Sequence, residues 1–520
     1  MSIKTGFALA ALLLSPTLAD PATAWTRGQP KPDAAKAAEV KKAFGMAWDG
    51  YYKHAFPHDT LLPITAAGND DRNAWGASAV DALSTAIIME DDKAVDQILK
   101  YVPTIDFTTT KNVSDPISLF ETNIRYLGGL LSGYDLLKGP FKHLVKGSNS
   151  ENVDALLQQA KTLADGLSVA FDSPTGIPYG TVFFNPTHRA NVTETTNGPA
   201  GFGTLVLEWT RLTDLTGNKT YAELAQKAQT YLMDTKGLPE LYPGLVGIEF
   251  NITTGKVTDN RGSWGGGIDS YYEYLIKMYL YDPVEFAHYK DKWVLAAEST
   301  IKHLVSHPST RPDLTFLGVY STRNGTKKIV PVSQHLASFA GGNFILGGVL
   351  LNEPKYIDFG LKLTESYYET YTQTASGIGP EVFRWVATSS DIRPPVKDTA
   401  FYKKAGFWAT YKDYVLRPET IESLYYAYRV TGNQKYQDMA WKAFTAIRDR
   451  CRAGVGFSGL TDVTLANGGE KDNFQESFFF AETLKYAYLM FAEESEVHFQ
   501  GHGKSEFVYN TEAHPVRARA

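Results

Sequence analysis

Two kinds of predicted helix alternate along this chain, and the alternation restricts the fold more than any other feature of the sequence. One kind has a single apolar face, as in residues 35–49, 152–163 and 436–447. The other kind begins at a short turn of small residues, Gly or Pro and continues as an apolar and aromatic helix. Helices with one apolar face cover a core, whereas helices that are apolar all round lie inside it. The sequence therefore predicts an all-α protein with inner and outer helices.

Seven segments have the pattern of an inner helix start. Six place an acid in or near the first helical turn, and one, residues 335–342, lacks the acid. The other six are residues 75–81, 118–121, 203–208, 264–269, 416–419 and 475–478. Seven such starts predict a closed (α/α)7 barrel. No linker-like tract divides the chain, so we expect residues 25–520 to form one domain. Residues 243–252 and 316–321 are expected to form small β-hairpins that close one end.

The amino terminus has the composition of a cleavable secretory signal. Lys4 precedes an apolar run, residues 6–14, and small residues lead to cut sites after Ala19 or Ala24. The run is too short for a membrane span, which needs about 20 residues, and no later stretch supplies one. A buried amino-terminal helix is the alternative. We expect residues 1–24 to be a signal peptide and the protein to be secreted or to lie in the secretory-pathway lumen. Five sequons fit this route, at Asn112, Asn191, Asn218, Asn251 and Asn324.

Composition excludes several classes of protein. With 43% hydrophobic and 21% charged residues, the chain can bury a core and is not disordered. The net charge is −6, without a dense Lys/Arg run, so we expect neither nucleic acid nor an anionic membrane as a partner. The 13% aromatic content suits a cleft that binds sugar rings and suits helix packing equally well. We expect a monomer, and the single cysteine, Cys451, excludes an intramolecular disulfide.

The acids at the predicted inner helix starts need a common explanation. One carboxylate in a first turn caps backbone N–H groups and complements the helix dipole, which is sufficient for each acid alone. If the inner helices all start at one end, however, the acids converge on one cavity, and converging acids are costly unless they are paired. Arg125 and Arg417 are the natural partners, and Glu121 lies four residues before Arg125 on one helical face. The converging set is Glu121, Glu208, Asp269, Glu419, Glu422, Glu476 and Glu482.

Converging carboxylates indicate a class of chemistry. Two carboxylates across a sugar, one donating a proton and one activating water, are the minimal machinery of glycoside hydrolysis. Crowded acids also raise one another's pKa, as a general acid at mildly acidic pH requires. These residues alone predict a secreted glycosidase, and a sugar-binding barrel is the alternative.

Six motifs, in order between about residue 40 and residue 515, resemble glycoside hydrolase family 47, the class I α-1,2-mannosidases. The motifs are residues 73–83, 119–131, 269–275, 416–424, 476–486 and 510–515. The resemblance implies an (α/α)7 barrel, an inverting mechanism, an essential Ca²⁺, and removal of terminal α-1,2-mannose from high-mannose N-glycans and mannose oligosaccharides. The alternative is a non-hydrolytic, mannose-binding lectin of the glycoprotein-degradation-enhancing type, although all the catalytic acids are present.

The resemblance also implies catalytic roles at the matching positions. Glu121 would be the general acid, acting through a water, and Asp269 an alternative proton donor. Glu419 would be the base that activates the attacking water. Glu381 matches a further family acid, although a loop carboxylate after Pro often only accepts hydrogen bonds from backbone N–H groups.

The implied Ca²⁺ site is centred on Thr511, whose carbonyl and hydroxyl would bind the ion. Waters and mannose hydroxyls would complete the shell, as suits an ion that prefers many hard oxygen ligands. Glu476 and Glu512 would hold waters of that shell, and Phe478 would stack on the mannose that is released. The other implied substrate-binding residues are Arg125, Glu208, His335, Arg417, Glu422 and Glu482.

The chain departs from the family pattern in two places. Endoplasmic-reticulum members with narrow specificity carry an Arg two residues before the catalytic Asp, where this chain has Gly267. We therefore expect broad trimming of several mannoses. Secreted members typically have a disulfide, but its two positions are Ser338 and Tyr367 here. Cys451 matches neither end, and we expect a free, inert thiol.

Overall fold

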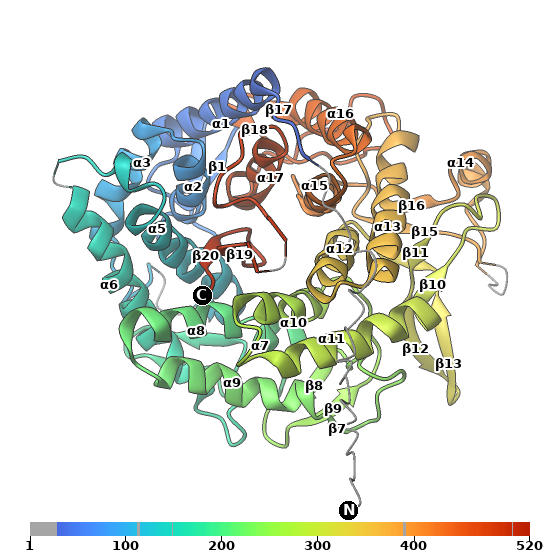
Figure 1. The fold of residues 1–520 in the computed structure, drawn as a ribbon, viewed down its shortest axis with the longest axis horizontal. Helices are drawn as coiled ribbons and strands as arrows, with labels where there is room; N and C mark the ends of the chain where they lie inside the picture. The colour runs from blue at the N-terminus through green and yellow to red at the C-terminus, as the bar shows by residue number, and fades with distance from the viewer. Residues whose placement is uncertain (1–28, 112–114, 148, 388–391, 502, 520) are drawn as a thin grey trace, which may run out of the picture.

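The computed structural model describes residues 29–111, 115–147, 149–387, 392–501 and 503–519. The expected signal peptide, residues 1–24, and the sequon at Asn112 lie outside these ranges. Helices in the described residues alternate between an inner and an outer ring (Figure 1), which confirms the predicted all-α (α/α)7 barrel. The inner helices are α2 (Ala77–Ile88), α5 (Gly128–Lys138), α8 (Val206–Thr216), α10 (Asp269–Tyr281), α12 (Ala340–Leu351), α15 (Glu419–Thr431) and α17 (Leu484–Leu489). The outer helices are α1 (Ala34–His54), α3 (Asp92–Tyr101), α6 (Asn149–Leu167), α9 (Thr220–Met233), α11 (Ala287–Ser299), α13 (Pro354–Gln373) and α16 (Gln434–Cys451).

Burial distinguishes the two rings as the sequence pattern predicts. Every residue of α2 is buried. The next helix, α3, buries one face only, formed by Ala94, Val95, Ile98 and Leu99. This difference follows from position, because an inner helix packs on all sides and an outer helix faces water on one side.

Two inner helices begin with a turn of π-helix. The short α4 (Leu119–Thr122) continues into the π-helix η2 (Asn123–Leu127) and then into α5, and the π-helix η8 (Phe479–Thr483) precedes α17. Arg125 lies in η2 and Glu482 in η8. Single π-turns inside helices are frequent at functional sites, and both residues are among the expected site residues.

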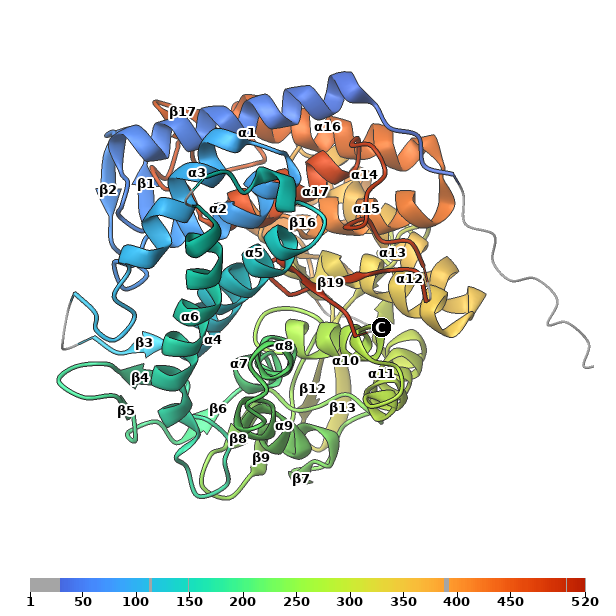
Figure 2. The same cartoon turned by 60° about the vertical axis from the view of Figure 1, so that its left-hand side comes forward.

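Small sheets surround the ring. The stretches expected to form hairpins do contain strands: β8 (Glu249–Asn251) pairs with β9 (Lys256–Asp259), and β12 (Val319–Arg323) pairs with β13 (Thr326–Val330). Figure 1 draws them at the edge of the ring, and the strand pair inside the ring is β19 (Phe507–Tyr509) with β20 (Pro515–Arg517) (Figures 1 and 2). The prediction that the hairpins of residues 243–252 and 316–321 close one end was therefore wrong. The central hairpin is β19–β20, whose three-residue strands are too short to show a hydrophobic period in the sequence. Shorter elements at the edge include β1 (Thr60–Leu62), β2 (Ala67–Asn69), β3 (Ile117–Ser118), β4 (Thr181–Phe183), β5 (Arg189–Ala190), β6 (Thr196–Asn197), β7 (Lys236–Gly237), β10 (Val305–Ser306), β11 (Phe316–Leu317), β14 (Val332–Gln334), β15 (Val382–Arg384), β16 (Trp408–Tyr411), β17 (Arg452–Ala453), β18 (Gly456–Phe457), α7 (Pro199–Gly203) and α14 (Thr399–Ala405).

The two positions at which the resemblance implies a disulfide, Ser338 and Tyr367, each form a hydrogen bond with another residue. The Ser338 hydroxyl donates to the His335 carbonyl at 2.6 Å, and the Tyr367 and Ser333 hydroxyls lie 2.6 Å apart. Cys451 is free and buried, as expected, and burial raises the pKa of its thiol far above the usual value. A buried thiol that resists ionisation is a poor nucleophile.

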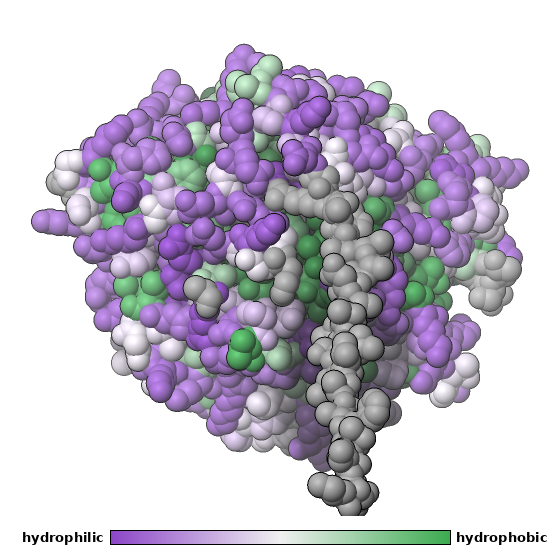
Figure 3. Space-filling view, in the orientation of Figure 1, coloured by the Kyte–Doolittle hydropathy of each residue, from purple (hydrophilic) through white to green (hydrophobic). Residues whose placement is uncertain are grey.

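The face drawn in Figure 3 is mostly hydrophilic, with scattered hydrophobic residues. Over the described ranges, none of the helices combines the length and the apolar character that crossing a membrane requires.

Candidate active site

The starts of the inner helices meet in the centre of the ring, at one end. His335 precedes α12, and its Nδ1 lies 2.7 Å from Oε2 of Glu419, the first residue of α15. Arg125 of η2 donates to the Ser477 hydroxyl before η8 at 3.2 Å, and its Nη1 lies 3.5 Å from Oδ2 of Asp81 on α2. The predicted convergence of helix starts is therefore present in the structure. We call the space between them, which reaches solvent at the 33% exposed side chain of Glu121, the cavity.

One side of this cavity is formed by Glu121, Arg125 and Glu512, which we call the Glu121 cluster. The Glu121 Oε2 accepts hydrogen bonds from Nε and Nη2 of Arg125 at 2.9 and 2.8 Å. Arg125 also forms an ion pair with Glu512. Burial raises the pKa of Glu121, but Arg125 and then Arg72 lower it by more, so its net pKa lies below the usual value. Glu121 is thus held as a carboxylate.

The opposite side is formed by His335, Glu381, Arg417 and Glu419, the Glu419 cluster. Besides the bond to Glu419, the His335 ring places Nε2 2.6 Å from the Tyr371 hydroxyl. Arg417 donates from Nε to Oε2 of Glu381 at 2.5 Å, and its Nη1 lies 3.9 Å from Oε1 of Glu419. Burial raises the pKa of Glu419, yet His335 and Arg417 lower it below the usual value.

Two further acids beside this cluster have raised pKa values. Burial raises the pKa of Asp269 to about 6, and the charges of Glu273 and Glu419 add to the shift. Burial also raises the pKa of Glu381 despite its ion pair with Arg417. Glu381 accepts a hydrogen bond from the Val415 N–H at 3.4 Å, the backbone role that its place after Pro suggested. Asp269 and Glu419 therefore have pKa shifts of opposite sign in one site.

The turn between β19 and β20 forms the floor of the cavity. The Asn510 amide donates to Glu208 Oε1 and to the Ile124 carbonyl, both at 2.9 Å, and its Oδ1 accepts from the backbone N–H of Glu512 at 3.0 Å. The Thr511 N–H donates to the Tyr274 hydroxyl at 3.2 Å. Within the described ranges, no hydrogen bond engages the hydroxyl or the carbonyl of Thr511. The turn is fixed, and both of these oxygens remain free to bind a ligand.

The buried carboxylates around this turn carry more negative charge than the neighbouring positive groups balance. Burial, with the charge of Glu273, raises the pKa of Glu422 to about 8. Burial raises the pKa of Glu482 and of Glu512 well above the usual range. Burial also raises the pKa of Glu208 to about 7, and its Oε2 has no hydrogen-bond partner. These groups are costly to ionise because they lie together in a buried space.

This donor set fits an oxygen-bound divalent cation. No three or more His, Cys, Asp or Glu side chains among the described residues are arranged to hold a metal by themselves. The two free Thr511 oxygens, with water, would give a cation at this position an all-oxygen ligand set of the kind that Ca²⁺ prefers. Nearby positive charge would also lower the raised pKa values of the surrounding carboxylates.

Phe478 and Glu476 lie between the two clusters. The guanidinium carbons of Arg125 and Arg417 are 5.6 and 6.0 Å from the centre of the Phe478 ring, and the ring is 8% exposed. Burial raises the pKa of Glu476, while Arg125, Arg72 and Arg417 oppose the shift. Contacts and neighbouring charges thus connect the expected site residues with one another near the starts of the inner helices. Their individual roles stay predictions.

Sequence analysis missed several groups that shape this site. Glu273 forms an ion pair with Lys277 one helical turn further along α10, and the four-residue spacing could have revealed it. Lys485 donates to the Ser84 hydroxyl at 2.8 Å and to the Ala513 carbonyl at 2.5 Å. No local pattern identifies Lys485 or Asn510, because their partners are distant in the sequence.

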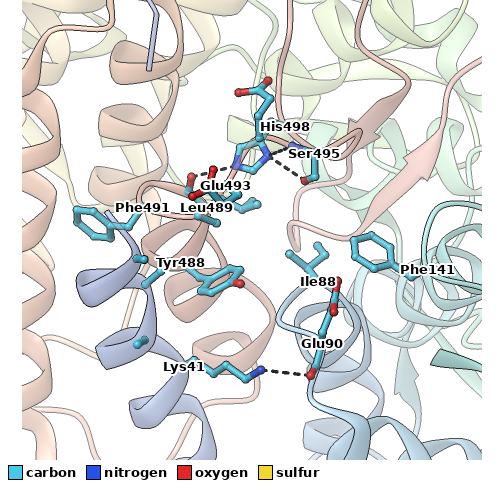
Figure 4. Close-up of a pocket in the computed structure, with 15 residues that line it drawn as sticks. Lys41, Ile88, Glu90, Phe141, Tyr488, Leu489, Phe491, Glu493, Ser495 and His498 are labelled. Carbon is cyan, nitrogen blue, oxygen red and sulfur yellow. Dashed lines mark hydrogen bonds between the residues drawn. The ribbon is translucent and has the colours of Figure 1, made fainter. Parts of the chain in front are cut away.

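A separate pocket of about 430 Å³ lies where the inner helices end (Figure 4). It is lined by the start of α1 and the ends of α2 and α17, and we call it the far-end pocket. Lys41 donates to the carbonyls of Met89 and Glu90 at 2.6 and 3.2 Å. His498 Nε2 lies 3.1 Å from the Leu489 carbonyl. Lys41 therefore caps the end of α2 and His498 contacts the end of α17, while Glu90, Glu493 and Glu494 also line the pocket.

The chain is similar to known proteins over nearly its whole length. The model of glycosyl hydrolase family 47 matches residues 43–518. The mannosyl-oligosaccharide alpha-1,2-mannosidase 1B of Aspergillus phoenicis is 55% identical over 483 residues, which is 93% of this chain and 91% of the relative. The mannosyl-oligosaccharide alpha-1,2-mannosidase of Penicillium citrinum is 53% identical over 99% of both chains. The solved structure of an alpha-1,2-mannosidase from Trichoderma reesei superposes with a TM-score of 0.91 and 59% identity, covering 94% of this chain and all of that one.

Proposed function

This chain belongs to glycosyl hydrolase family 47 and is a mannosyl-oligosaccharide α-1,2-mannosidase, and we propose that it trims high-mannose N-glycans by a Ca²⁺-dependent, inverting mechanism. The observation that carries the mechanism is the opposite pKa shift of Asp269 and Glu419 in one cavity. Two carboxyl groups whose environments separate their pKa values are suited to act as an acid and a base.

Glu419 is proposed as the base. An ionised carboxylate only accepts hydrogen bonds, so His335 donates from Nδ1, and Nε2 then accepts from the Tyr371 hydroxyl. This arrangement orients the Glu419 carboxylate and keeps it ionised. Glu419 takes a proton from the attacking water, which an inverting glycosidase activates on the face opposite the leaving group.

Asp269 is proposed as the proton donor to the glycosidic oxygen. The resemblance implies Glu121 as the acid and Asp269 as the alternative, and the pKa directions favour Asp269. Asp269 is protonated below pH of about 6, whereas the ion pair with Arg125 keeps Glu121 ionised. Glu121 then orients Arg125 and accepts hydrogen bonds from sugar hydroxyls or water.

Thr511 is proposed to hold Ca²⁺ through its hydroxyl and carbonyl, with Glu476 and Glu512 binding waters around it. When bound, the ion supplies positive charge that offsets the buried carboxylates and orients the 2- and 3-hydroxyls of mannose. Glu208, Glu422 and Glu482 line the same space and bind sugar hydroxyls or water, and Phe478 packs against the ring of the released mannose.

Gly267 supports broad trimming of several mannoses. Its φ is +93°, in the region that favours glycine, so its backbone is adapted to the absence of a side chain. An open position two residues before Asp269 leaves room for different glycan branches beyond the cleaved bond.

The direct test is a time course on the nine-mannose glycan, with and without a chelator. We expect several mannoses to be released, each first as the β-anomer in proton NMR spectra, and no release from Glu419→Gln. Release of the α-anomer would contradict inversion, and trimming that stops after one mannose would contradict broad specificity. Binding of the glycan without release would instead support the lectin alternative.

We also propose that the protein is a monomer that works in the secretory pathway or outside the cell. The amino-terminal signal and the exposed sequons at Asn218 and Asn324 support this location. Sedimentation analysis of protein collected from the culture medium, with mass spectrometry of its amino terminus and glycans, tests both statements.

A further inference from the structure

A buried carboxylate shapes the loop between β2 and α2. Asp59 is fully buried, and its two oxygens accept hydrogen bonds from the Tyr126 hydroxyl at 3.1 Å and from backbone N–H groups. The backbone donors are Arg72, Ala74, Gly76 and Ala77, at 2.8, 2.7, 2.8 and 3.1 Å. The Tyr126 hydroxyl has a single proton, which it shares between Asp59 and the closer Arg72 carbonyl at 2.6 Å. Both backbone polar groups of Arg72 are therefore fixed by buried partners.

The same loop holds strained backbone. Asn73 and Ala74 have φ of +77° and +62°, a conformation that a residue with a Cβ adopts only at a cost. Such strain persists where the surrounding structure imposes it, and it concentrates at functional sites. Here the hydrogen bonds that Asp59 accepts impose the positive φ of Asn73 and Ala74, the two residues directly after Arg72.

The fixed backbone directs the Arg72 side chain toward the cavity. Its Nε lies 3.9 Å from Oε2 of Glu121, and its Nη1 lies 3.2 Å from Oδ2 of Asp71. The charge of Arg72 also acts on Glu476 and Glu512, as expected for a group that faces the same cavity.

Exposure places Arg72 at the mouth of the cavity. The side chains of Glu512 and Arg125 are 3% and 6% exposed, whereas those of Glu121 and Arg72 are 33% and 31% exposed. An enzyme that removes a terminal mannose holds that mannose at the closed floor, beside Thr511 and Glu512, so the rest of the glycan extends toward the mouth. Arg72 therefore lies where the sugar beyond the cleaved bond passes.

Arg72 keeps donors available for that sugar. A guanidinium carries five N–H donors. Among the described residues, only Nη1 of Arg72 has acceptors within hydrogen-bonding distance, the Asp71 side chain and carbonyl. Nε and Nη2 can therefore donate to sugar hydroxyls.

We propose that Arg72 is a substrate-binding residue that donates hydrogen bonds to hydroxyls of the mannose on the leaving-group side of the cleaved bond. The proposal rests on the proposed function. It assigns to the loop after β2 a contact with the part of the glycan that remains after trimming.

The test compares two probes by calorimetry on the Ca²⁺-loaded protein. Mannose reaches only the floor, whereas α-1,2-mannobiose with sulfur in place of the linking oxygen also fills the leaving-group position and resists cleavage. We expect Arg72→Gln to weaken binding of the thio-disaccharide about tenfold, as for the loss of a charged hydrogen bond. Binding of mannose should change less than twofold. Arg72→Lys should recover part of the loss, because an ammonium can still donate.

The matched control is Arg448→Gln. Arg448 is 29% exposed and also pairs with an adjacent acid, Asp449, but it lies on the outer helix α16. We expect it to bind both probes as the unchanged protein does. Arg72→Gln should keep its thermal stability, because Asp59 binds the backbone of Arg72 and not its side chain.

Three outcomes would overturn the assignment of Arg72. Equal weakening of both probes would mean that Arg72 acts on the whole site through Glu121. Unchanged binding of both probes would mean that it makes no contact with substrate. If the unchanged protein bound neither probe, the proposed function itself would fail, which separates that failure from the other two.

Discussion

The two ends of the barrel use charge in opposite ways. At the end where the inner helices start, acids crowd into one cavity, and burial raises the pKa of Glu208, Asp269 and Glu422. At the end where they finish, Lys41 and His498 each contact helix carbonyls in the far-end pocket (Figure 4). Helix starts favour negative groups and helix ends favour positive ones, which suits the acids at the starts and Lys41 at the end of α2. His498 is neutral at pH 7, because burial lowers its pKa to about 4.

The difference between the ends lies in how the charges are partnered. Lys41 has carbonyl partners at 2.6 and 3.2 Å, as a cap requires. Glu422 and Glu482 have raised pKa values because carboxylates face carboxylates. Capping thus accounts for Lys41 in the far-end pocket, whereas the other end carries buried charge that only a ligand or a reaction makes useful.

The largest expected effect is on catalysis at the helix starts. Glu419→Gln removes the proposed base and should lower kcat for mannose release by about 10²–10⁴-fold. Lys41→Met at the far end should leave kcat unchanged, as measured with the same glycan. Comparable losses in the two variants would break the distinction between the ends.

Removal of Ca²⁺ should destabilise the protein by a few kcal/mol at pH 7 and by less at pH 5. The folded-state pKa values of Glu208 and Glu422 are raised, to about 7 and about 8, so the metal-free protein loses stability as pH rises from about 4 toward these values. Ca²⁺ offsets the ionised carboxylates at pH 7, while protons compete with it at pH 5. Calorimetric melting with and without a chelator measures both differences, and a larger effect at pH 5 would contradict the assigned site.

The alkaline side of the pH profile should identify the proton donor. Asp269 loses its proton as pH rises through about 6, so kcat/KM should fall about tenfold per pH unit above that value. Glu121→Gln should have lower activity and still show this fall in kcat/KM at alkaline pH. Asp269→Asn should lose most activity and should no longer show the fall. If the fall in kcat/KM above pH of about 6 disappeared in Glu121→Gln alone, Glu121 and not Asp269 would be the proton donor.

The smallest expected effect is on stability at the far end. Lys41→Met removes the donor to two carbonyls at the end of α2 and should lower the free energy of unfolding by about 1 kcal/mol in urea titrations. Lys442→Met, at an exposed position of the outer helix α16, is the matched control and should change it by less than about 0.5 kcal/mol. A substantial loss of mannose release in Lys41→Met would show that the far end also serves the reaction.

Local patterns in the sequence were sufficient for the architecture. Helical periods distinguished inner from outer helices, and the acids at helix starts, with the family motifs, identified the residues that the structure brings together. The hairpin β19–β20 was missed as a central element, because its short strands have no period of their own. Its turn was found only through the resemblance.

Sequence alone thus determined which helices face inward and which acids gather, because both properties repeat at the period of a helix. The partners of those acids and the pKa of each acid were decided only by the closed ring. Arg125 meets Glu512, 387 residues away, and His335 meets Glu419, 84 residues away. Burial and charge neighbours fix each pKa, and both depend on contacts between segments that the chain brings together only when the barrel closes. The position of Arg72 over Glu121 arises in the same way, from a loop held by Asp59.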